Sequence, residues 1–284
     1  MISLVKIAIF ATALIGGAVA QDDGKNIIRK CDQPGLFALT FDDGPGAPTG
    51  DLLALLKKED IKATFFSLGV QAQDARFSHF LKQAYEEGHQ IASHTHTHNS
   101  LNDLTPDLIR QQMTTADAAI KGAIGVSPTY MRPPFGNCNV ECQKIMEEMK
   151  YHIISWNVDS NDWQYVTTPH LHDSLVTNVK AKVDIANISV DSFISLQHDI
   201  HQFSVNRTLQ VIQAIRAKEF RFVTVAECLN HKYPMYRDAK DNSGPNSVNY
   251  KVDSQSKNTS SDGTIVIPAL ITAGVSVVAA IFGI

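Results

Sequence analysis

The segment LFALTFDDGP, residues 36–45, says most about how this chain folds. Its apolar run from Leu36 to Phe41 predicts a strand buried on both faces, as in parallel sheets. Two carboxylates, Asp42 and Asp43, and a Gly-Pro turn follow that strand directly. In folds built from repeated βα units, functional groups sit at the carboxyl ends of the strands. The segment therefore predicts both a parallel sheet and the position of a site.

Strand-like and helix-like segments alternate along the rest of the chain, from Cys31 to Cys228. Further strands are expected at residues 63–68, 90–93, 152–156 and 192–196. Helices are expected at residues 50–59, 76–87, 105–124, 140–149, 170–182 and 204–217. Thr105 followed by Pro106 is a normal helix start. This α/β pattern predicts a single-domain (β/α) barrel, closed or nearly closed, rather than an open sheet.

The two ends of the chain predict its location. Residues 1–20 have the features of a secretory signal peptide, with an uncleaved membrane anchor as the alternative. We expect the folded domain at residues 21–237 and a polar linker at 238–263. The uncharged apolar tail, residues 264–284, completes a GPI-anchor signal that is removed from the mature protein; a retained transmembrane helix is the alternative. Both ends predict a cell-surface protein, attached to the plasma membrane or cell wall.

The composition limits the classes of partner. The 284 residues are 44% hydrophobic and 19% charged, which fits a globular protein. The formal net charge is −4, and no basic run is present. The chain therefore lacks the electrostatic footprint of a nucleic-acid-binding protein.

Four cysteines make an even count in a chain that is expected to enter an oxidising compartment. Cys138 and Cys142 are close enough to bridge a local turn, which leaves Cys31 to pair with Cys228. The alternatives are four unpaired thiols or a zinc site. Sequons for N-glycosylation begin at Asn187, Asn206 and Asn258.

The adjacent carboxylates and a histidine cluster suggest a metal site. Like charges repel, so one of the two aspartates is expected to bind a cation or pair with a base, unless both lie in a surface turn. His94 and His98, at i and i+4, can reach one metal from a helical turn, whereas in a strand His96 would share their face. A solvated His/Thr-rich loop is the alternative. With Asp43, the two histidines supply the ligand count of a catalytic Zn²⁺ site that leaves one position for water.

Five motifs occur in order: T-F-D-D-G-P (40–45), H-T-x-x-H (94–98), R-P-P-F (132–135), D-x-x-D-W (159–163) and L-x-H (196–198). Together they resemble the polysaccharide deacetylases of the NodB-homology group, carbohydrate esterase family 4, and among them the secreted fungal chitin deacetylases. The resemblance covers roughly Ile27 to Leu229. It implies a distorted (β/α) barrel and metal-dependent hydrolysis of the N-acetyl groups of chitin, which yields chitosan and acetate.

The resemblance also implies a metal and its ligands. The metal would be Zn²⁺ or Co²⁺, bound by Asp43, His94 and His98, with His96 as an intervening residue. Such a metal polarises the acetyl carbonyl and lowers the pKa of a bound water. The resemblance also implies that the partner is a chitin chain or oligosaccharide. The enzyme is expected to be a monomer.

The remaining motif residues receive roles by the same resemblance. Asp42 would contact the substrate and act as general base, paired with Arg132. The backbone N–H of Phe135, where the family often has Tyr, would help to stabilise the oxyanion. His198, oriented by Asp162, would be the general acid for the leaving amine. The walls of the acetyl pocket would be Trp163 and Leu196. No role is assigned to Asp159, Asp199 or His201.

Other functions remain open from the sequence. The same chemistry could act on peptidoglycan or acetylxylan, although the signal peptide, sequons and tail indicate a eukaryotic wall and favour chitin. An inactive wall protein that binds carbohydrate is a second alternative, but every motif position is occupied. A glycosidase would use paired carboxylates without a metal, and the histidine pair argues against it.

Overall fold

A computed structural model describes residues 26–237 of the chain. The expected signal peptide, polar linker, apolar tail and the Asn258 sequon lie outside these residues. Among the described residues, no helix is both long and apolar enough to cross a membrane.

The core of the fold is a parallel sheet. Its strands are β1 (Ile27–Ile28), β2 (Leu36–Ala38), β3 (Thr40–Asp42), β4 (Thr64–Ser67), β5 (Gln90–Ser93), β6 (Tyr130–Met131), β7 (His152–Ile154), β8 (Val158–Asp159), β9 (Phe193–His198) and β10 (Arg221–Val223). The order is β1-β7-β6-β5-β4-β3-β9-β2-β10, with β8 also paired to β9. Every ladder is parallel, which confirms the predicted α/β class.

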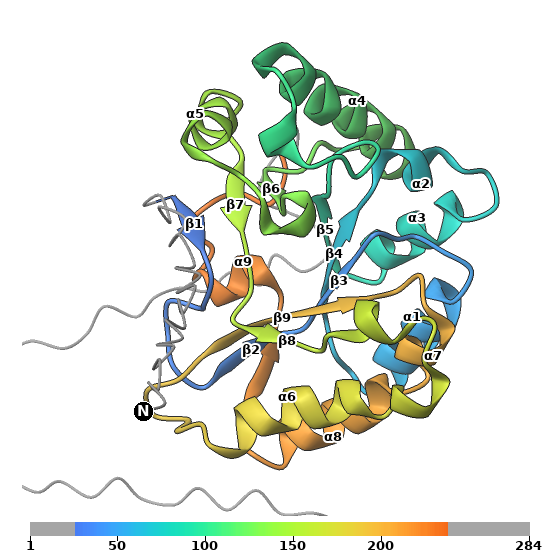
Figure 1. The fold of residues 1–284 in the computed structure, drawn as a ribbon, viewed down its shortest axis with the longest axis vertical. Helices are drawn as coiled ribbons and strands as arrows, with labels where there is room; N and C mark the ends of the chain where they lie inside the picture. The colour runs from blue at the N-terminus through green and yellow to red at the C-terminus, as the bar shows by residue number, and fades with distance from the viewer. Residues whose placement is uncertain (1–25, 238–284) are drawn as a thin grey trace, which may run out of the picture. The chain divides into compact units, whose positions relative to one another are not determined.

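Helices lie outside the strands (Figure 1). They are α1 (Thr49–Lys58), α2 (Gly69–Gln73), α3 (Ser78–Glu86), α4 (Pro106–Ile124), α5 (Val140–Glu148), α6 (Ser174–Asp184), α7 (Gln202–Val205), α8 (Thr208–Arg216) and α9 (Val225–Cys228), with 3₁₀ turns η1 (Leu101–Asp103), η2 (Pro134–Gly136), η3 (Asp162–Tyr165) and η4 (Pro169–Leu171). In Figure 1, α6 and α8 pack side by side, and α2, α3 and α4 lie on the other side of the strands.

Helix α4 shows how the sequence sets these elements. The Thr105 side chain caps the helix by accepting a hydrogen bond from the backbone N–H of Leu108, and Pro106 occupies the first turn. Gly125 ends the helix with a left-handed φ of 84°, which glycine adopts without a steric penalty. The buried residues recur every three or four positions, namely Ile109, Met113, Ala116, Ala119, Ile120 and Ile124.

The predicted strand at residues 36–41 is interrupted at Leu39. Both halves pair with β9 in one continuous register, with Phe37 opposite Phe193 and Phe41 opposite Gln197. On its other side, the first half pairs with β10 and the second half with β4. The helix expected at 204–217 also divides, into α7 and α8. Strands β1, β6, β8 and β10 were not expected, because two or three residues are too short to show a period.

The sheet curls into a barrel but is not closed by a continuous ladder. Strand β7 pairs with β6, and β8 pairs with β9, while residues 155–157 between β7 and β8 form no strand. We call residues 155–157 the seam. At the seam, the side chain of Asn157 adds to the backbone contacts with β9. Its backbone N–H donates to the Ile194 carbonyl (3.0 Å), its side-chain oxygen accepts from the N–H of Ile194 (2.9 Å), and its amide group donates to the Ser192 carbonyl (2.9 Å).

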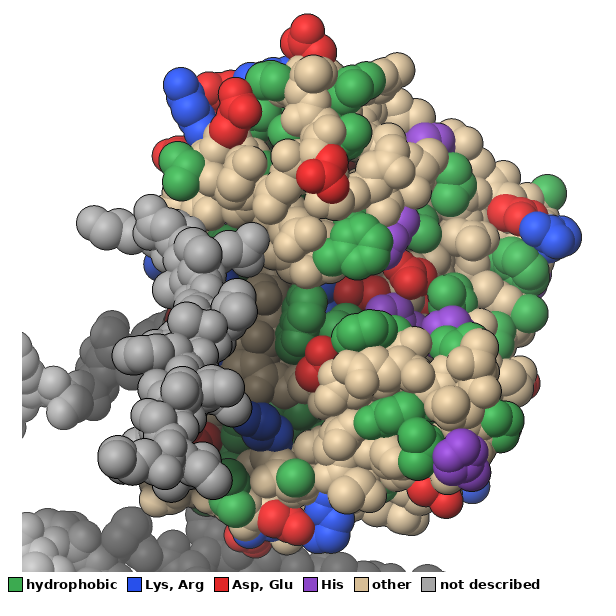
Figure 2. Space-filling model, in the orientation of Figure 1, with side chains coloured by type: hydrophobic (Ala, Val, Ile, Leu, Met, Phe, Trp, Pro, Cys, Tyr) green, Lys and Arg blue, Asp and Glu red, His purple; other side chains and the backbone are tan. Residues whose placement is uncertain are grey.

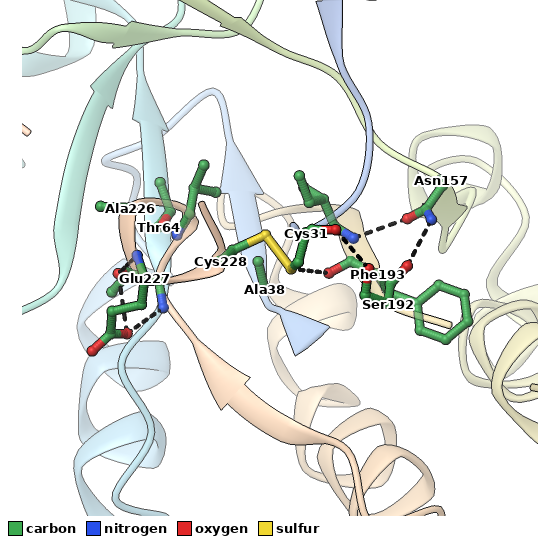
Figure 3. The surroundings of a disulfide bond; sticks show 12 residues. Cys31, Ala38, Thr64, Asn157, Ser192, Phe193, Ala226, Glu227 and Cys228 are labelled. Atoms are coloured by element: carbon green, nitrogen blue, oxygen red, sulfur yellow. Dashed lines mark hydrogen bonds between the residues drawn. A yellow bond between two sulfur atoms is a disulfide. The ribbon is translucent and has the colours of Figure 1, made fainter. Parts of the chain in front are cut away.

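Both predicted disulfides are present. Cys31 follows β1 and Cys228 ends α9, so their bond joins the two ends of the folded region (Figure 3). Around it, the N–H of Asp32 donates to the Cys228 carbonyl (3.0 Å), and the Ser192 hydroxyl donates to the Cys31 carbonyl (3.1 Å). Cys138 and Cys142 form the local bridge.

Candidate functional site

The five motifs meet at the carboxyl ends of the strands. Asp42 lies opposite His198 in the ladder between β3 and β9, so the first and fifth motifs are adjacent. Ser93 lies opposite Met131 in the ladder between β5 and β6, so His94 and Arg132 follow neighbouring strands. The sequence had placed Arg132 in a turn between helices; it instead follows the short strand β6. Histidine and acidic side chains gather on one face of the molecule (Figure 2).

Asp43, His94 and His98 form a group that could hold a metal ion. The Asp43 Oδ1 atom lies 3.4 Å from Nε2 of His94 and 3.4 Å from Nε2 of His98. One ligand atom from each residue lies within 4.8 Å of the others. Asp43 Oδ1 is buried and has no hydrogen-bond partner. A carboxylate oxygen left unpaired beside two imidazole nitrogens has the chemistry of a divalent-metal site.

The buried His94 is prepared to be a metal ligand. Its Nδ1 atom lies 2.7 Å from the Arg132 carbonyl oxygen, which can only accept a hydrogen bond. Nδ1 therefore carries the proton, and Nε2 presents its lone pair toward Asp43. Burial lowers the pKa of His94 to about 3. The ring is thus neutral, which is the form that binds metals.

The two histidines reach one point through a strained loop. Strand β5 ends at Ser93, so His94–His98 is neither the helical turn nor the strand considered from the sequence. Thr95 and His98 have φ values of 70° and 61°, which are uncommon for residues other than glycine. His96 is outside the group: its backbone N–H donates to the side chain of Gln112 (3.0 Å). Asp43 and Phe135 also have positive φ values, so strained backbone clusters at the site.

Asp42 and Arg132 form a fully buried ion pair beside this group. Arg132 Nη1 donates to Asp42 Oδ1 at 2.7 Å and to the Thr40 hydroxyl at 2.9 Å. Burial raises the pKa of Asp42 and outweighs the opposing effect of the Arg132 charge. Asp42 is therefore a stronger base than an ordinary carboxylate, while Arg132 fixes its orientation.

The same guanidinium also spans the seam of the barrel. Arg132 Nη2 donates to the carbonyl of Ser155 in the seam (3.2 Å) and to the carbonyl of Ser195 on β9 (3.3 Å). The guanidinium carbon lies 4.1 Å from the centre of the Phe66 ring. Arg132 thus provides a donor for the Ser155 carbonyl in the seam and shares the Ser195 carbonyl with the Thr40 hydroxyl.

His198 and Asp162 form the second charged pair. The two side chains meet at 2.7 Å between His198 Nδ1 and Asp162 Oδ1. Asp162 Oδ2 also accepts from the His198 backbone N–H (2.8 Å) and from the Ser204 hydroxyl (2.6 Å). Burial opposes a charge on His198, but the hydrogen bond and charge of Asp162 outweigh it and raise the pKa to about 9. His198 is therefore protonated at neutral pH, and its Nε2 lies 3.9 Å from Asp43 Oδ2.

The side chains at the mouth of the site are apolar. Phe135 is 64% exposed and Trp163 is 52% exposed, so neither is a core aromatic. The Phe135 ring lies edge-on to the His98 ring, with centroids 4.6 Å apart. Leu196 is buried within β9. Asp159 accepts a hydrogen bond from the N–H of Asn161 (2.7 Å) and so closes a turn.

Sequence reasoning missed two supporting groups. Ser204 donates to Asp162, and Thr40 both accepts from Arg132 and donates to the Ser195 carbonyl. Ser204 lies outside every motif, so no local signal marks it. Of the described sequons, Asn187 and Asn206 have exposed side chains, and their glycosylation stays a prediction.

The chain is similar to known proteins in both sequence and fold. A family model described as polysaccharide deacetylase matches residues 29–154. The chitin deacetylase of Colletotrichum lindemuthianum is 36% identical over 208 residues, which cover 71% of this chain and 82% of that protein. A peptidoglycan-N-acetylglucosamine deacetylase of Bacillus cereus is 33% identical over 193 residues, covering 66% of each chain. The solved structure of the Colletotrichum lindemuthianum chitin deacetylase superposes with a TM-score of 0.70 and 33% identity, over 74% of this chain and 95% of that one.

Proposed function

Because the chain belongs to the polysaccharide deacetylase family, hydrolases that act on N-acetyl amide bonds, we propose that it is a metal-dependent chitin deacetylase. It would hydrolyse the N-acetyl groups of chitin and release acetate and chitosan. One observation carries the proposal: the group Asp43, His94 and His98 lies between a buried base, Asp42, and a protonated acid, His198.

A divalent ion held by Asp43, His94 and His98, for which Zn²⁺ is the first candidate and Co²⁺ the second, would supply a polarised acetyl carbonyl and an acidified water. Asp42 would take the proton from the attacking water. Its Oδ1 is held by Arg132, so Oδ2, which lies 3.8 Å from His94 Nε2, is the oxygen that faces the metal ligands. The raised pKa of Asp42 suits it to this task.

His198 completes the reaction by giving its Nε2 proton to the departing amine. An amine leaves poorly unless it is protonated, so the step requires an acid that is charged at the working pH. Asp162 holds the other ring nitrogen and keeps Nε2 directed toward the metal ligands. The backbone N–H of Phe135 would donate to the developing oxyanion, and Trp163 and Leu196 would border the acetyl methyl.

Two substrates other than chitin deserve a test. The similarity to the Bacillus cereus enzyme supports peptidoglycan, and acetylxylan would need the same chemistry. The similarity to the Colletotrichum lindemuthianum enzyme and the features of a secreted eukaryotic chain favour chitin. An inactive carbohydrate-binding protein is disfavoured, since the base, the acid and the candidate ligands are all present and oriented.

The test is acetate release from chitin oligomers, peptidoglycan and acetylxylan by the purified protein. The protein is assayed as isolated, after chelation, and after Zn²⁺ or Co²⁺ is restored. We expect release from chitin that chelation removes and metal restores. Asp42→Asn should abolish it, whereas Asp184→Asn, which changes an exposed carboxylate on α6, should not. Chelation-resistant release would contradict the metal, and release from another polymer alone would change the substrate.

We also propose that the protein is secreted and held at the cell surface by a GPI lipid, and that it acts as a monomer. The sequence features of residues 1–20 and 238–284 support this location. A phosphatidylinositol-specific phospholipase should release the protein from intact cells. Retention after treatment would favour a transmembrane tail.

A further inference from the structure

Asp199 is a second buried carboxylate next to the proposed metal ligands, and no motif includes it. Asp42 and His198 are ladder partners at the ends of β3 and β9. Asp43 directly follows β3 and Asp199 directly follows β9, so the two residues leave the sheet side by side. Asp199 is only 1% exposed, and its Oδ1 atom has no hydrogen-bond partner.

The other oxygen of Asp199 belongs to a short buried chain of hydrogen bonds. The Thr49 hydroxyl, at the start of α1, donates to Asp199 Oδ2 at 2.6 Å. The same hydroxyl accepts from the backbone N–H of Gly46 at 2.8 Å. Thr49 is 1% exposed, so water does not compete for these bonds. Asp199 and Thr49 therefore hold one end of the turn formed by residues 43–46.

Gly44 shows how closely the carboxylate approaches this turn. A Cβ atom added to Gly44 would lie 2.1 Å from Asp199 Oδ2 and 2.3 Å from Oδ1. The carboxylate thus lies directly against the backbone that follows Asp43. On the opposite side, the Ser67 hydroxyl donates to the Gly44 carbonyl at 2.8 Å. The turn is therefore held between β4 and β9.

We propose that Asp199 and Thr49 are positioning residues that fix the turn at residues 43–46 and so hold the Asp43 carboxylate ready for the metal. Asp43 has a φ of 75°, a conformation that a free chain rarely adopts and that surrounding contacts must maintain. Neither residue belongs to the group of candidate ligands, Asp43, His94 and His98. The proposal rests on the proposed function, because it concerns the metal site of that reaction.

The first test measures Zn²⁺ affinity directly, by competition of the metal-free protein with a chromogenic chelator. Residues that orient a metal ligand typically contribute about 10- to 100-fold to affinity. We expect Asp199→Ala and Thr49→Val to weaken Zn²⁺ binding by about that factor. Thr49→Ser keeps the hydroxyl, so its Zn²⁺ affinity should stay close to that of the unaltered protein. At saturating Zn²⁺ the variants should recover much of kcat, with KM for chitin oligomers unchanged.

A matched control removes a buried threonine hydroxyl elsewhere. Thr129 precedes β6, at the amino end of the sheet, and its hydroxyl donates to the carbonyls of Pro234 and Met235. Thr129→Val should lower the melting temperature without changing Zn²⁺ affinity. This control separates positioning of the ligand from general loss of stability.

The second test uses the contact between Gly44 and Asp199. Gly44→Ala places a methyl group where the carboxylate lies, so it should weaken Zn²⁺ binding. Combined with Asp199→Ala, which removes the obstruction, the effects should be less than additive. Additive effects would contradict the geometry.

Besides additive effects in the double variant, two results would overturn the inference. Zn²⁺ affinity could stay within about twofold of the unaltered protein in folded Asp199→Ala and Thr49→Val. It could also fall equally in Thr129→Val. Failure of the proposed function is distinguishable, because the unaltered protein would then bind no Zn²⁺ or release no acetate, and the inference would fall with it.

Discussion

The charge on His198 offers the most direct test of the acid–base assignment. Asp162→Asn keeps the shape of the side chain but removes the charge that holds the imidazolium at 2.7 Å. In the intact protein the pKa of His198 is raised from 6.5 to about 9. That difference corresponds to roughly 3 kcal/mol, at about 1.4 kcal/mol per pH unit.

The size and sign of the effect follow from this pKa. Once Asp162 is neutral, burial still disfavours the charged ring and the charges of Asp42 and Asp43 still favour it, so the pKa of His198 should fall to about its ordinary value of 6.5. The acid form is lost as the pH rises through the pKa, so the alkaline limb of kcat/KM should move down by about 2.5 pH units. At about pH 7.5 the protonated fraction should drop from nearly all to roughly one tenth, which predicts a loss of about tenfold or more.

The assay is acetate release from chitin oligomers at saturating Zn²⁺, from about pH 5 to pH 10. An NMR titration of the His198 ring gives its pKa independently of turnover. Asp159→Asn is the matched control, because it neutralises a carboxylate at the end of β8 that interacts with His198 only through its charge and makes no hydrogen bond to it. Its alkaline limb should stay near that of the unaltered protein.

Asp162 also accepts hydrogen bonds from Ser204 and from the His198 backbone, so Asp162→Asn should lower stability, and circular dichroism must show that it is folded. An alkaline limb that does not move in the folded variant would refute the reasoning. A loss of rate that is equal at every pH would show that Asp162 only positions the ring.

Three further predictions concern other parts of the site and the fold. Arg132→Met leaves Asp42 buried and unpaired, and we expect it to cost about 3–5 kcal/mol of unfolding free energy in urea, part of which Asp42→Asn should restore in the double variant. Replacing Cys31 and Cys228 by serine should cost about 2–5 kcal/mol, measured by guanidinium unfolding beside the reduced parent. Phe135→Tyr should keep kcat within about twofold, because the proposed oxyanion donor is a backbone N–H; a much larger loss would assign a role to the side chain.

Much of the fold could be predicted from the sequence because its long elements carry clear periods. Helix α4 buries a regular apolar pattern and β9 is a compact, fully buried strand, and both were expected close to where they lie. The seam was predicted wrongly: residues 155 and 156 were expected to complete the strand at 152–156, but β7 ends at Ile154. Residues 155–157 are ordinary in sequence, and only their pairing sets them apart. Arg132 likewise gave no sign that it would satisfy backbone groups of Ser155 and Ser195.

The candidate site divides in the same way. Asp43, His94 and His98 could be predicted as a group because their residue types and spacing already suit a metal. The route by which the histidines converge could not, since it depends on left-handed backbone at Thr95 and His98. Asp199 was seen but given no role, because its function depends on a turn that lies far away in sequence.

The two disulfides also set an order of events during synthesis of the chain. Cys31 emerges from the ribosome long before its partner Cys228, since 197 positions separate them. Cys138 and Cys142, only four positions apart, emerge in between and would be the nearest wrong partners for Cys31. Because short loops close at lower entropic cost than long ones, we expect these two to pair with each other first if the chain is oxidised as it is made. Cys31 would then have only Cys228 left as a partner, and that bond could form only after the last βα unit has been made.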